Sequence, residues 1–374
     1  MAERLLIRGL HGSPIAIATV DGRIIGLDAV ALAAAADVVI DGAGLTAHPG
    51  FIDLQVNGVD GFDFTADPGS ILLAGEALAS HGVTAYLPTI VTGPRGAVEA
   101  AFDALAGGDQ PRGAVPLGLH IEGPFISPER RGAHAREHLR ASDLDEIAAW
   151  LAAGARMITL APELPGALDA IGAIVDAGAV AAIGHTDADA ETTARAVDAG
   201  ARYATHLFNA MPPLEHRRPG PVGALLVDER VTVGLIADGV HVDPLVLGLV
   251  ARVAAGRVSI VSDAVATGLG GRVLDHGPSG ARLADGTLAG GSHGLDHGVR
   301  TFAAIAGRAA AIAAVTEVPA RLLGLDGQGG AIRVGGRADF VLLDDDLEVA
   351  ATIVGGRVAY LRGPGAAAPG AAPG

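Results

Sequence analysis

Three short segments of the chain carry residues that could hold a metal ion. Glu122 lies in "GLHIEGPF", His185 in "AAIGHTDA" and His206 in "ATHLFNAM", and each comes after a run of apolar residues. Two histidines and one carboxylate are the ligand set of an open catalytic metal site, in which water takes the fourth position. We predict that they bind one divalent ion, with zinc first and iron, manganese or cobalt as alternatives. For Glu122 alone, a loop contact or a helix N-cap is the other interpretation.

Asp263, in "SIVSDAVATG", is a candidate for proton transfer. A carboxylate beside a metal site can accept a proton from water and pass it to a leaving group. Aspartate is also a favoured helix N-cap, and the spacing alone does not separate these two roles.

Positive charge gathers in two segments of an otherwise acidic chain. "HRRPGPVG" holds Arg217 and Arg218, and "IADGVHVDP" holds His241. Arginine binds phosphate through paired hydrogen bonds, so these segments could receive an anionic group of a substrate. For the arginine pair, an exposed and solvated loop is an equally good interpretation.

The composition limits the chemistry that is available. The 374 residues have a formal net charge of -16, no Cys and no Lys, so all 26 basic residues are Arg. These absences exclude thiolate and Schiff-base chemistry, the GK[ST] phosphate loop and a metal pair bridged by a carboxylated lysine. The charge argues against nucleic acid or an anionic membrane as a partner. We find no signal peptide or membrane span, and we therefore expect a soluble, cytoplasmic protein.

The candidate residues follow apolar segments that alternate with Ala-rich, helix-like stretches. Eight such segments are candidate strands, near residues 48–56, 83–89, 115–122, 157–161, 179–184, 201–206, 231–237 and 258–262. Polar residues recur at their C-terminal ends, which is the face on which (β/α)8 barrels build active sites. We therefore predict an α/β protein with a TIM-like barrel over residues 48–330, in preference to a doubly wound open sheet.

The two ends of the chain have another pattern. Residues 1–47 and 331–362 consist of short strand-like runs separated by turn residues, and we predict that they pair into one small β-sandwich domain. The tail, residues 363–374, contains only Gly, Ala and Pro, and we predict that it is disordered.

Several of these segments together resemble a known family. The segments "PGFIDLQVNG", "GLHIEGPFI", "GAH", "IGHTDA", "ATHLFNAMPPL", "RPGPVGALL", "IADGVHVD" and "VSDAVATG" run from residue 49 to about residue 268. In this order they are similar to the N-acetylglucosamine-6-phosphate deacetylases of the amidohydrolase superfamily. The resemblance implies metal-dependent hydrolysis of the acetamide of N-acetyl-D-glucosamine 6-phosphate, which gives D-glucosamine 6-phosphate and acetate.

The resemblance also implies roles for individual residues. Glu122, His185 and His206 match the metal ligands, and Asp263 matches the catalytic acid/base. His134, in "GAH", matches a residue that contacts the substrate near its acetamido group. Asn209 and Ala210 match a substrate-binding pair that uses backbone groups, and Arg217 and His241 match the sugar-phosphate contacts. In this family some of these contacts come from a partner subunit, so the resemblance implies a homodimer.

Gln55 and Asn57 stand where related hydrolases carry a histidine pair that holds a second metal ion. Neutral amides are poor zinc ligands compared with imidazole, so we expect one metal ion per subunit. We expect the two amides to fill the position of the second ion and to orient the site by hydrogen bonds.

The substrate has alternatives. N-acetylgalactosamine 6-phosphate differs from the gluco sugar at one hydroxyl group, and a single sequence does not separate the two. His293 stands where relatives carry an apolar residue near the edge of the substrate, and Arg218 stands where an acidic residue is common. A cyclic-amide hydrolase of the same superfamily is a more distant alternative, since this chain lacks both the histidine pair and the bridging lysine.

Overall fold

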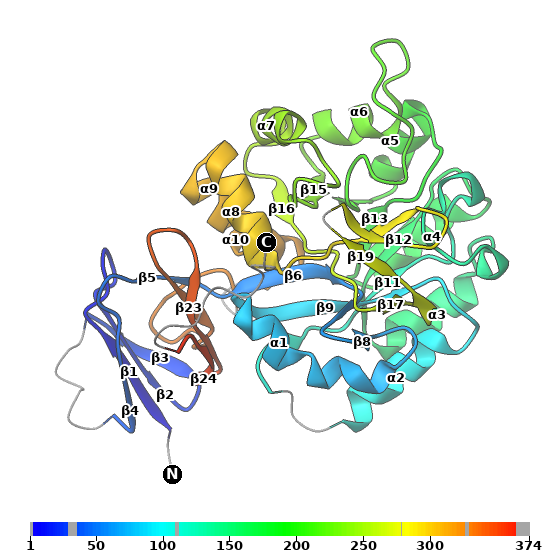
Figure 1. The fold of residues 1–374 in the computed structure, drawn as a ribbon. Helices are drawn as coiled ribbons and strands as arrows, with labels where there is room; N and C mark the ends of the chain where they lie inside the picture. The colour runs from blue at the N-terminus through cyan, green and yellow to red at the C-terminus, as the bar shows by residue number, and fades with distance from the viewer. Residues whose placement is uncertain (1–2, 29–35, 109–111, 278, 326–328, 364–374) are drawn as a thin grey trace.

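The computed structural model describes residues 3–28, 36–108, 112–277, 279–325 and 329–363. A barrel surrounded by helices makes up most of the molecule, and a smaller all-β unit lies at its side, built from both ends of the chain (Figure 1). The tail that we predicted to be disordered lies outside the described residues from residue 364 onward. No described helix is long and apolar enough to span a bilayer.

The barrel is built from parallel strands in chain order. Its strands are β6 (Phe51–Val56), β9 (Val83–Val91), β11 (Leu119–Glu122), β12 (Ala155–Leu160), β13 (Val180–Ile183), β14 (Tyr203–Ala204), β15 (Thr232–Leu235) and β16 (Val258–Ile260). A parallel bridge between Val56 and Ala264 brings the first strand beside the segment that follows the last one. This nearly closed arrangement confirms the predicted barrel, and it sets all strand C-termini around one rim.

Helices cover the outside of the barrel because each presents an apolar face to it. They are α1 (Gly75–Ser80), α2 (Ala97–Gly107), α3 (Leu144–Ala153), α4 (Ala167–Asp176), α5 (Ala190–Asp198), α6 (Gly220–Val227), α7 (Pro244–Val253), α8 (Leu295–Ala306), α9 (Arg308–Ala313) and α10 (Glu317–Leu322), with 3-10 turns at Pro68–Leu73, Pro128–Arg130 and Arg136–His138. Asp143, Asp189 and Asp243 accept hydrogen bonds from backbone N–H groups at the starts of α3, α5 and α7.

The side unit contains two four-stranded sheets, in the orders β3-β2-β1-β4 and β24-β23-β22-β5. Their strands are β1 (Arg4–Arg8), β2 (Ala16–Val20), β3 (Arg23–Leu27), β4 (Val38–Asp41), β5 (Thr46–Pro49), β22 (Phe340–Leu343), β23 (Val349–Val354) and β24 (Arg357–Leu361). An aliphatic cluster that includes Ile7, Ile17 and Leu342 packs between them. β5 pairs with β22 along its whole length and ends at Pro49. The chain leaves the side unit at this residue.

A Gly-rich insertion between β16 and α8 was not anticipated as a separate structure. It forms small antiparallel ribbons from β17 (Gly268–Leu269), β18 (Arg272–Val273), β19 (Asp275–Gly277), β20 (Gly280–Arg282) and β21 (Leu288–Gly290). Short strands β7 (Gly58–Val59) and β8 (Phe62–Asp63) form another ribbon, and β10 (Val115–Pro116) pairs with β9. The insertion lies over the rim of the barrel on which the strands end (Figure 1).

Candidate active site

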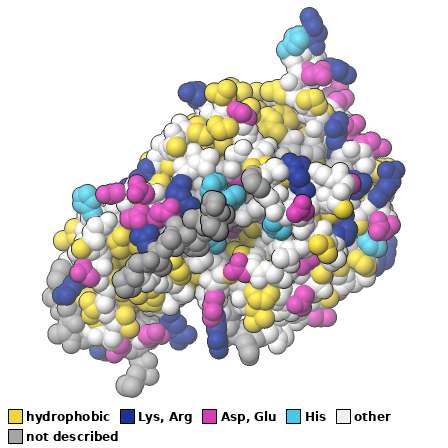
Figure 2. All heavy atoms as spheres, in the orientation of Figure 1, with side chains coloured by type: hydrophobic (Ala, Val, Ile, Leu, Met, Phe, Trp, Pro, Cys, Tyr) yellow, Lys and Arg dark blue, Asp and Glu magenta, His cyan; other side chains and the backbone are white. Residues whose placement is uncertain are grey.

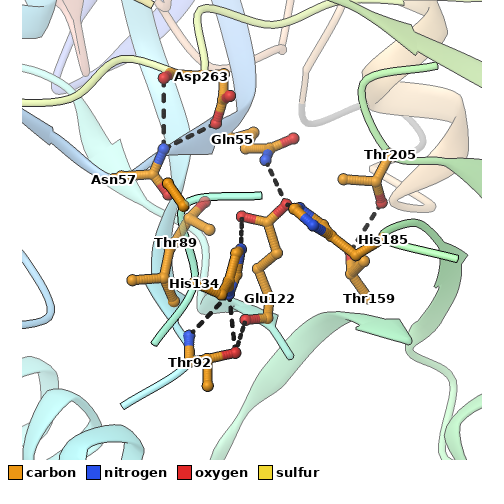
Figure 3. A network of polar contacts seen from close by, with 12 residues as sticks. Gln55, Asn57, Thr89, Thr92, Glu122, His134, Thr159, His185, Thr205 and Asp263 are labelled. Carbon is orange, nitrogen blue, oxygen red and sulfur yellow. Dashed lines mark hydrogen bonds and ion pairs between the residues drawn. The ribbon is translucent and has the colours of Figure 1, made fainter. Parts of the chain in front are cut away.

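The three predicted metal ligands meet at the C-terminal rim of the barrel. Figure 3 shows Glu122 and His185 there. His206 Nε2 lies 2.9 Å from Glu122 Oε1, His185 Nε2 lies 3.3 Å from the same oxygen, and the two Nε2 atoms are 3.1 Å apart. All three side chains are buried. One carboxylate oxygen and two imidazole nitrogens that converge on one point fit a divalent ion such as zinc, with a position left for water.

The backbone at this rim adopts a conformation that is uncommon outside glycine. His185, His206 and Asp263 have φ values of 49°, 30° and 47°, in the left-handed region. Each residue follows a barrel strand directly or after a short extension, so the chain turns sharply there and directs the side chain inward. Such conformations cost free energy and concentrate at functional sites.

His185 is oriented by a hydrogen bond behind the ring. Its Nδ1 lies 2.9 Å from the carbonyl oxygen of Arg130. A carbonyl only accepts, so Nδ1 carries the proton and Nε2 offers its lone pair to the site. In metal-binding histidines, a hydrogen bond from the ring nitrogen that does not bind the metal usually fixes the orientation and the tautomer of the ring.

Electrostatics keep Glu122 ionised. Burial acts to raise the pKa of Glu122, but its contacts with His185 and His206 outweigh this effect and hold that pKa well below its ordinary value. For His206, burial acts to lower the pKa, and the contact with Glu122 outweighs this effect and raises it. The carboxylate is therefore available as a ligand.

The two amides of the first barrel strand, Gln55 and Asn57, contact the site directly. Gln55 Nε2 donates to Glu122 Oε1 at 2.9 Å, and Asn57 Nδ2 donates to Asp263 Oδ1 at 2.8 Å. Burial raises the pKa of Asp263 to about 7, and the charge of Glu122 adds to this effect. Asp263 thus has a pKa close to neutrality, which suits a residue that both accepts and donates a proton.

A pocket of about 270 Å³ opens at this rim and gathers most of the predicted site residues. Its lining includes Asn57, Glu122, His134, His185, His206, Asn209, Ala210, His241 and Asp263. The insertion forms its roof through Leu269 and residues 287–290. Gly290 and Gly291 tie this roof to the catalytic segment, because Gly291 N donates to Asp263 O at 2.8 Å.

Two pairs of side chains hold histidines of the pocket in place. His241 Nδ1 lies 2.8 Å from Asp238 Oδ2. Burial acts to raise the pKa of Asp238, but the hydrogen bond and charge of His241 and two backbone N–H groups outweigh it and bring the pKa to about 2. On the other side of the pocket, His134 Nδ1 lies 2.8 Å from Thr92 Oγ1.

Arg217 does not line the pocket of its own chain. It belongs to a loop, residues 212–219, that projects from the body of the molecule beside α6 (Figures 1 and 2). Arg218 forms an exposed ion pair with Glu215 on the same loop. His293 is also absent from the pocket lining, and its ring stacks on His297 with the ring centroids 4.2 Å apart.

Sequence reasoning missed Thr92 and the roof. We placed the end of the second barrel strand at residue 89, whereas β9 continues to Val91. With the correct end, the rule that found the other site residues, a polar side chain directly after a buried strand, points to Thr92.

Comparison with known proteins agrees with this geometry. The model of the amidohydrolase family matches residues 46–359. The chain belongs to the amidohydrolase family. It is 40% identical over 353 residues to the N-acetylglucosamine-6-phosphate deacetylase of Bos taurus, covering 87% of this chain and 86% of that protein. Amidohydrolases are typically metal-dependent, in keeping with the three converging ligands.

Two further relatives bear on the substrate and the fold. The N-acetylgalactosamine-6-phosphate deacetylase of Escherichia coli O157:H7 is 37% identical over 334 residues, covering 83% of this chain and 87% of that protein. The structure of an N-acetyl-D-glucosamine-6-phosphate deacetylase mutant from Mycobacterium smegmatis, in complex with N-acetyl-D-glucosamine-6-phosphate, superposes with a TM-score of 0.84. It is 34% identical in sequence, and the match covers 96% of this chain and 99% of that one.

Proposed function

We propose that this amidohydrolase removes the acetyl group from N-acetyl-D-glucosamine 6-phosphate and releases D-glucosamine 6-phosphate and acetate, in the breakdown and recycling of amino sugars. One observation carries the proposal: a carboxyl group of near-neutral pKa, Asp263, lies in the same pocket as the converging Glu122, His185 and His206. The names of the relatives supply the substrate class. A charged sugar phosphate does not cross a membrane unaided and stays in the compartment where it is formed. We place the reaction in the cytoplasm.

Glu122, His185 and His206 would hold one divalent ion per subunit, with zinc first and iron, manganese or cobalt as alternatives. Such an ion supplies Lewis acidity, which makes water nucleophilic at neutral pH and polarises a carbonyl. Gln55 and Asn57 contact Glu122 and Asp263 through their N–H groups, which supports a single-ion site with the amides as orienting groups.

Asp263 accepts the proton of the attacking water and delivers it to the nitrogen of the departing sugar amine, so one carboxyl group serves both steps. Asn57 fixes Oδ1 of this carboxyl, which leaves Oδ2 for the proton. His134 contacts the acetamido group from the opposite wall of the pocket. Asn209 and Ala210 bind the sugar through backbone groups, and His241 contacts its phosphate together with Arg217.

A second copy of the chain completes the phosphate site in this proposal. Arg217 lies on the projecting loop and does not line its own pocket, which supports a phosphate contact in a neighbouring subunit. On the same side of the barrel, α7 exposes Leu245, Leu249 and Val253, which lie on one face at intervals of four residues. Hydrophobic side chains gather on this part of the surface in Figure 2. An isologous dimer would bury this face and bring both loops into use.

Acetate release tests the function. Metal-replete protein is incubated with N-acetyl-D-glucosamine 6-phosphate, with the unphosphorylated sugar and with N-acetyl-D-galactosamine 6-phosphate. We expect the highest kcat/KM for the gluco phosphate and little turnover of the unphosphorylated sugar. A preference for the galacto phosphate would establish the second candidate, which the 37% identical relative favours. No release from either phosphate would refute the proposal.

Mixing two inactive variants tests the dimer. An Arg217→Ala subunit retains Asp263, and an Asp263→Asn subunit retains Arg217. If the arginine acts across the interface, mixed dimers contain one complete site, and random exchange of subunits restores about a quarter of the wild-type activity. Mixtures that remain inactive after subunit exchange would show that Arg217 serves its own pocket or none.

A further inference from the structure

Thr92 lies directly after β9, next to the strand that carries Glu122, and it is buried. Its backbone N–H and its hydroxyl both lie within hydrogen-bond distance of one atom, and the hydroxyl also lies 3.5 Å from the carbonyl oxygen of Glu122. Thr92 Oγ1 lies 2.8 Å from His134 Nδ1, and the backbone N–H of Thr92 donates to His134 Nδ1 at 3.3 Å (Figure 3). Gly123 makes this approach possible, because a Cβ atom there would lie 2.2 Å from Thr92 Oγ1.

The backbone contact determines where the proton of His134 lies. A peptide N–H can only donate, so Nδ1 must present its lone pair to Thr92. A neutral imidazole carries its single proton on the other nitrogen in that case. His134 therefore has its N–H at Nε2, the nitrogen that lies 3.8 Å from Glu122 Oε2 on the inner side of the pocket.

His185 has the opposite arrangement. Its Nδ1 faces the carbonyl oxygen of Arg130, so the proton lies on Nδ1 and the lone pair on Nε2. The rings of His134 and His185 touch edge to face, with centroids 4.4 Å apart. Two neighbouring histidines thus differ in role because one backs onto a peptide N–H and the other onto a peptide carbonyl: His185 is a ligand and His134 is a donor.

We propose that Thr92 is a positioning residue, which holds His134 as the neutral Nε2–H tautomer so that it donates a hydrogen bond to the acetyl oxygen of the substrate. This role rests on the proposed deacetylation, whereas the tautomer does not depend on it. The oxygen gains negative charge as water attacks the carbonyl carbon, and a fixed donor stabilises that charge. An imidazolium would bring a second N–H against the N–H of Thr92. His134 therefore leaves proton transfer to Asp263.

Nitrogen-15 NMR of the histidine side chains tests the tautomer in the free protein. The signals of His134 are assigned by their loss in His134→Gln. We expect an unprotonated Nδ1 and a protonated Nε2 for His134, and the reverse for His185 as an internal reference. A protonated Nδ1 on His134 would overturn the inference, and this readout requires no substrate and no variant of Thr92.

Kinetics test the role. Thr92→Val keeps the size and the backbone N–H, and with it the tautomer, but removes the closer hydroxyl contact that holds the ring of His134 in position. We therefore expect kcat to fall by about ten- to a hundredfold while KM and metal content are retained. Thr92→Ser restores the hydroxyl and should recover most of kcat. Thr84→Val is the matched control, because Thr84 is also buried on β9 but donates weakly to Phe51 O far from the pocket, and it should keep the wild-type kcat.

The outcomes separate the two proposals. A Thr92→Val enzyme with wild-type kcat, or a serine variant as impaired as the valine variant, would refute the role of Thr92. Wild-type protein that releases no acetate from either sugar phosphate would refute the proposed function and leave the NMR result intact.

Discussion

The interior of the barrel contains two polar layers, and they differ in how completely the protein satisfies them. In the lower layer, formed by Thr89, His120, Thr159 and Thr205, the groups bond to one another and to the backbone. Thr159 lies 2.7 Å from His120 Nε2 and 2.8 Å from Thr205, and His120 Nδ1 lies 3.1 Å from Leu54 O. The upper layer, formed by Gln55, Asn57, Glu122, His185, His206 and Asp263, leaves Gln55 Oε1, Asn57 Oδ1 and His206 Nδ1 without a partner among the described residues.

The difference in hydrogen bonding distinguishes buried polar residues that stabilise the fold from buried polar residues that serve the site. Buried polar groups without hydrogen bonds are costly, so a folded protein retains them where something else repays the cost. Burial lowers the pKa of His120 to about 4, which keeps it neutral. With both nitrogens engaged, His120 is a core residue, although it lies only two positions from the ligand Glu122. Changes in the upper layer should therefore alter activity, and changes in the lower layer should alter stability.

The largest effect is expected for Asp263→Asn. Asparagine keeps the oxygen that accepts from Asn57, so the geometry persists, but it cannot carry the proton. We expect kcat to fall by about 10²–10⁴-fold with unchanged metal content and melting temperature. Steady-state kinetics and metal analysis check this result, and Asp275→Asn on the exposed strand β19 is the control. A variant that keeps its activity would mean that a group other than Asp263 transfers the proton.

Next in size is Glu122→Gln. Replacing a ligand with its neutral amide should weaken divalent-ion binding by more than the roughly 10- to 100-fold that changes behind a ligand cost. Chelator competition measures the affinity. Treating the wild-type protein with a chelator should abolish activity, and added zinc should restore it. Undiminished metal binding by the variant would contradict the assignment of this layer as a metal site.

A substitution in the lower layer should act on stability alone. Thr159→Val leaves His120 Nε2 without its donor, so we expect the free energy of unfolding to fall by about 1–3 kcal/mol. Metal content and kcat should be retained. Denaturant titration gives the change, and Thr159→Ser should behave like the wild type. Loss of metal with full stability would reverse the comparison between the two layers.

The last prediction concerns pH. Asp53 is fully buried, and burial raises its pKa to about 7, whereas an unfolded aspartate titrates near pH 3.9. Between these values the folded state binds more protons, so this residue makes stability fall as pH rises. Asp53→Asn removes that contribution. The melting temperature of the variant minus that of the wild type should increase from pH 5 to pH 8, whereas exposed Asp103→Asn should give a constant difference.

Much of the upper layer could be predicted from the sequence because it obeys a local rule. An apolar run predicts a buried strand, and the polar residue at its C-terminal end lies at the rim. This rule identified Glu122, His185, His206 and Asp263. The rule failed at Thr92 because the apolar run "IV" continued past Thr89. The same rule cannot distinguish His120 from a ligand, because its partners Leu54 and Thr159 come from other strands.

The roof could not be predicted from local pattern. Its strands are two or three residues long and rich in glycine, so neither apolar alternation nor propensity identifies them. They are held by contacts with the end of the barrel. Arg217 illustrates another limit. The local sequence predicts that it lies in a loop, but it does not predict the direction in which that loop projects.

The two glycines beneath the roof have a consequence for how new substrate preferences could arise. A Cβ atom at Gly290 would lie 2.7 Å from Asp263 O, and one at Gly291 would lie 2.2 Å from Ser262 O. The exposed side chains of the ribbon from β17 to β21 form a variable cassette, whereas its buried Leu269 and Leu274 pack against Val91 and Ala133 at the rim. Gly290 and Gly291 cannot vary, because a side chain at either position would collide with the backbone of Ser262 or Asp263. Libraries that seek other acetylated sugars should randomise the cassette and keep the glycine pair.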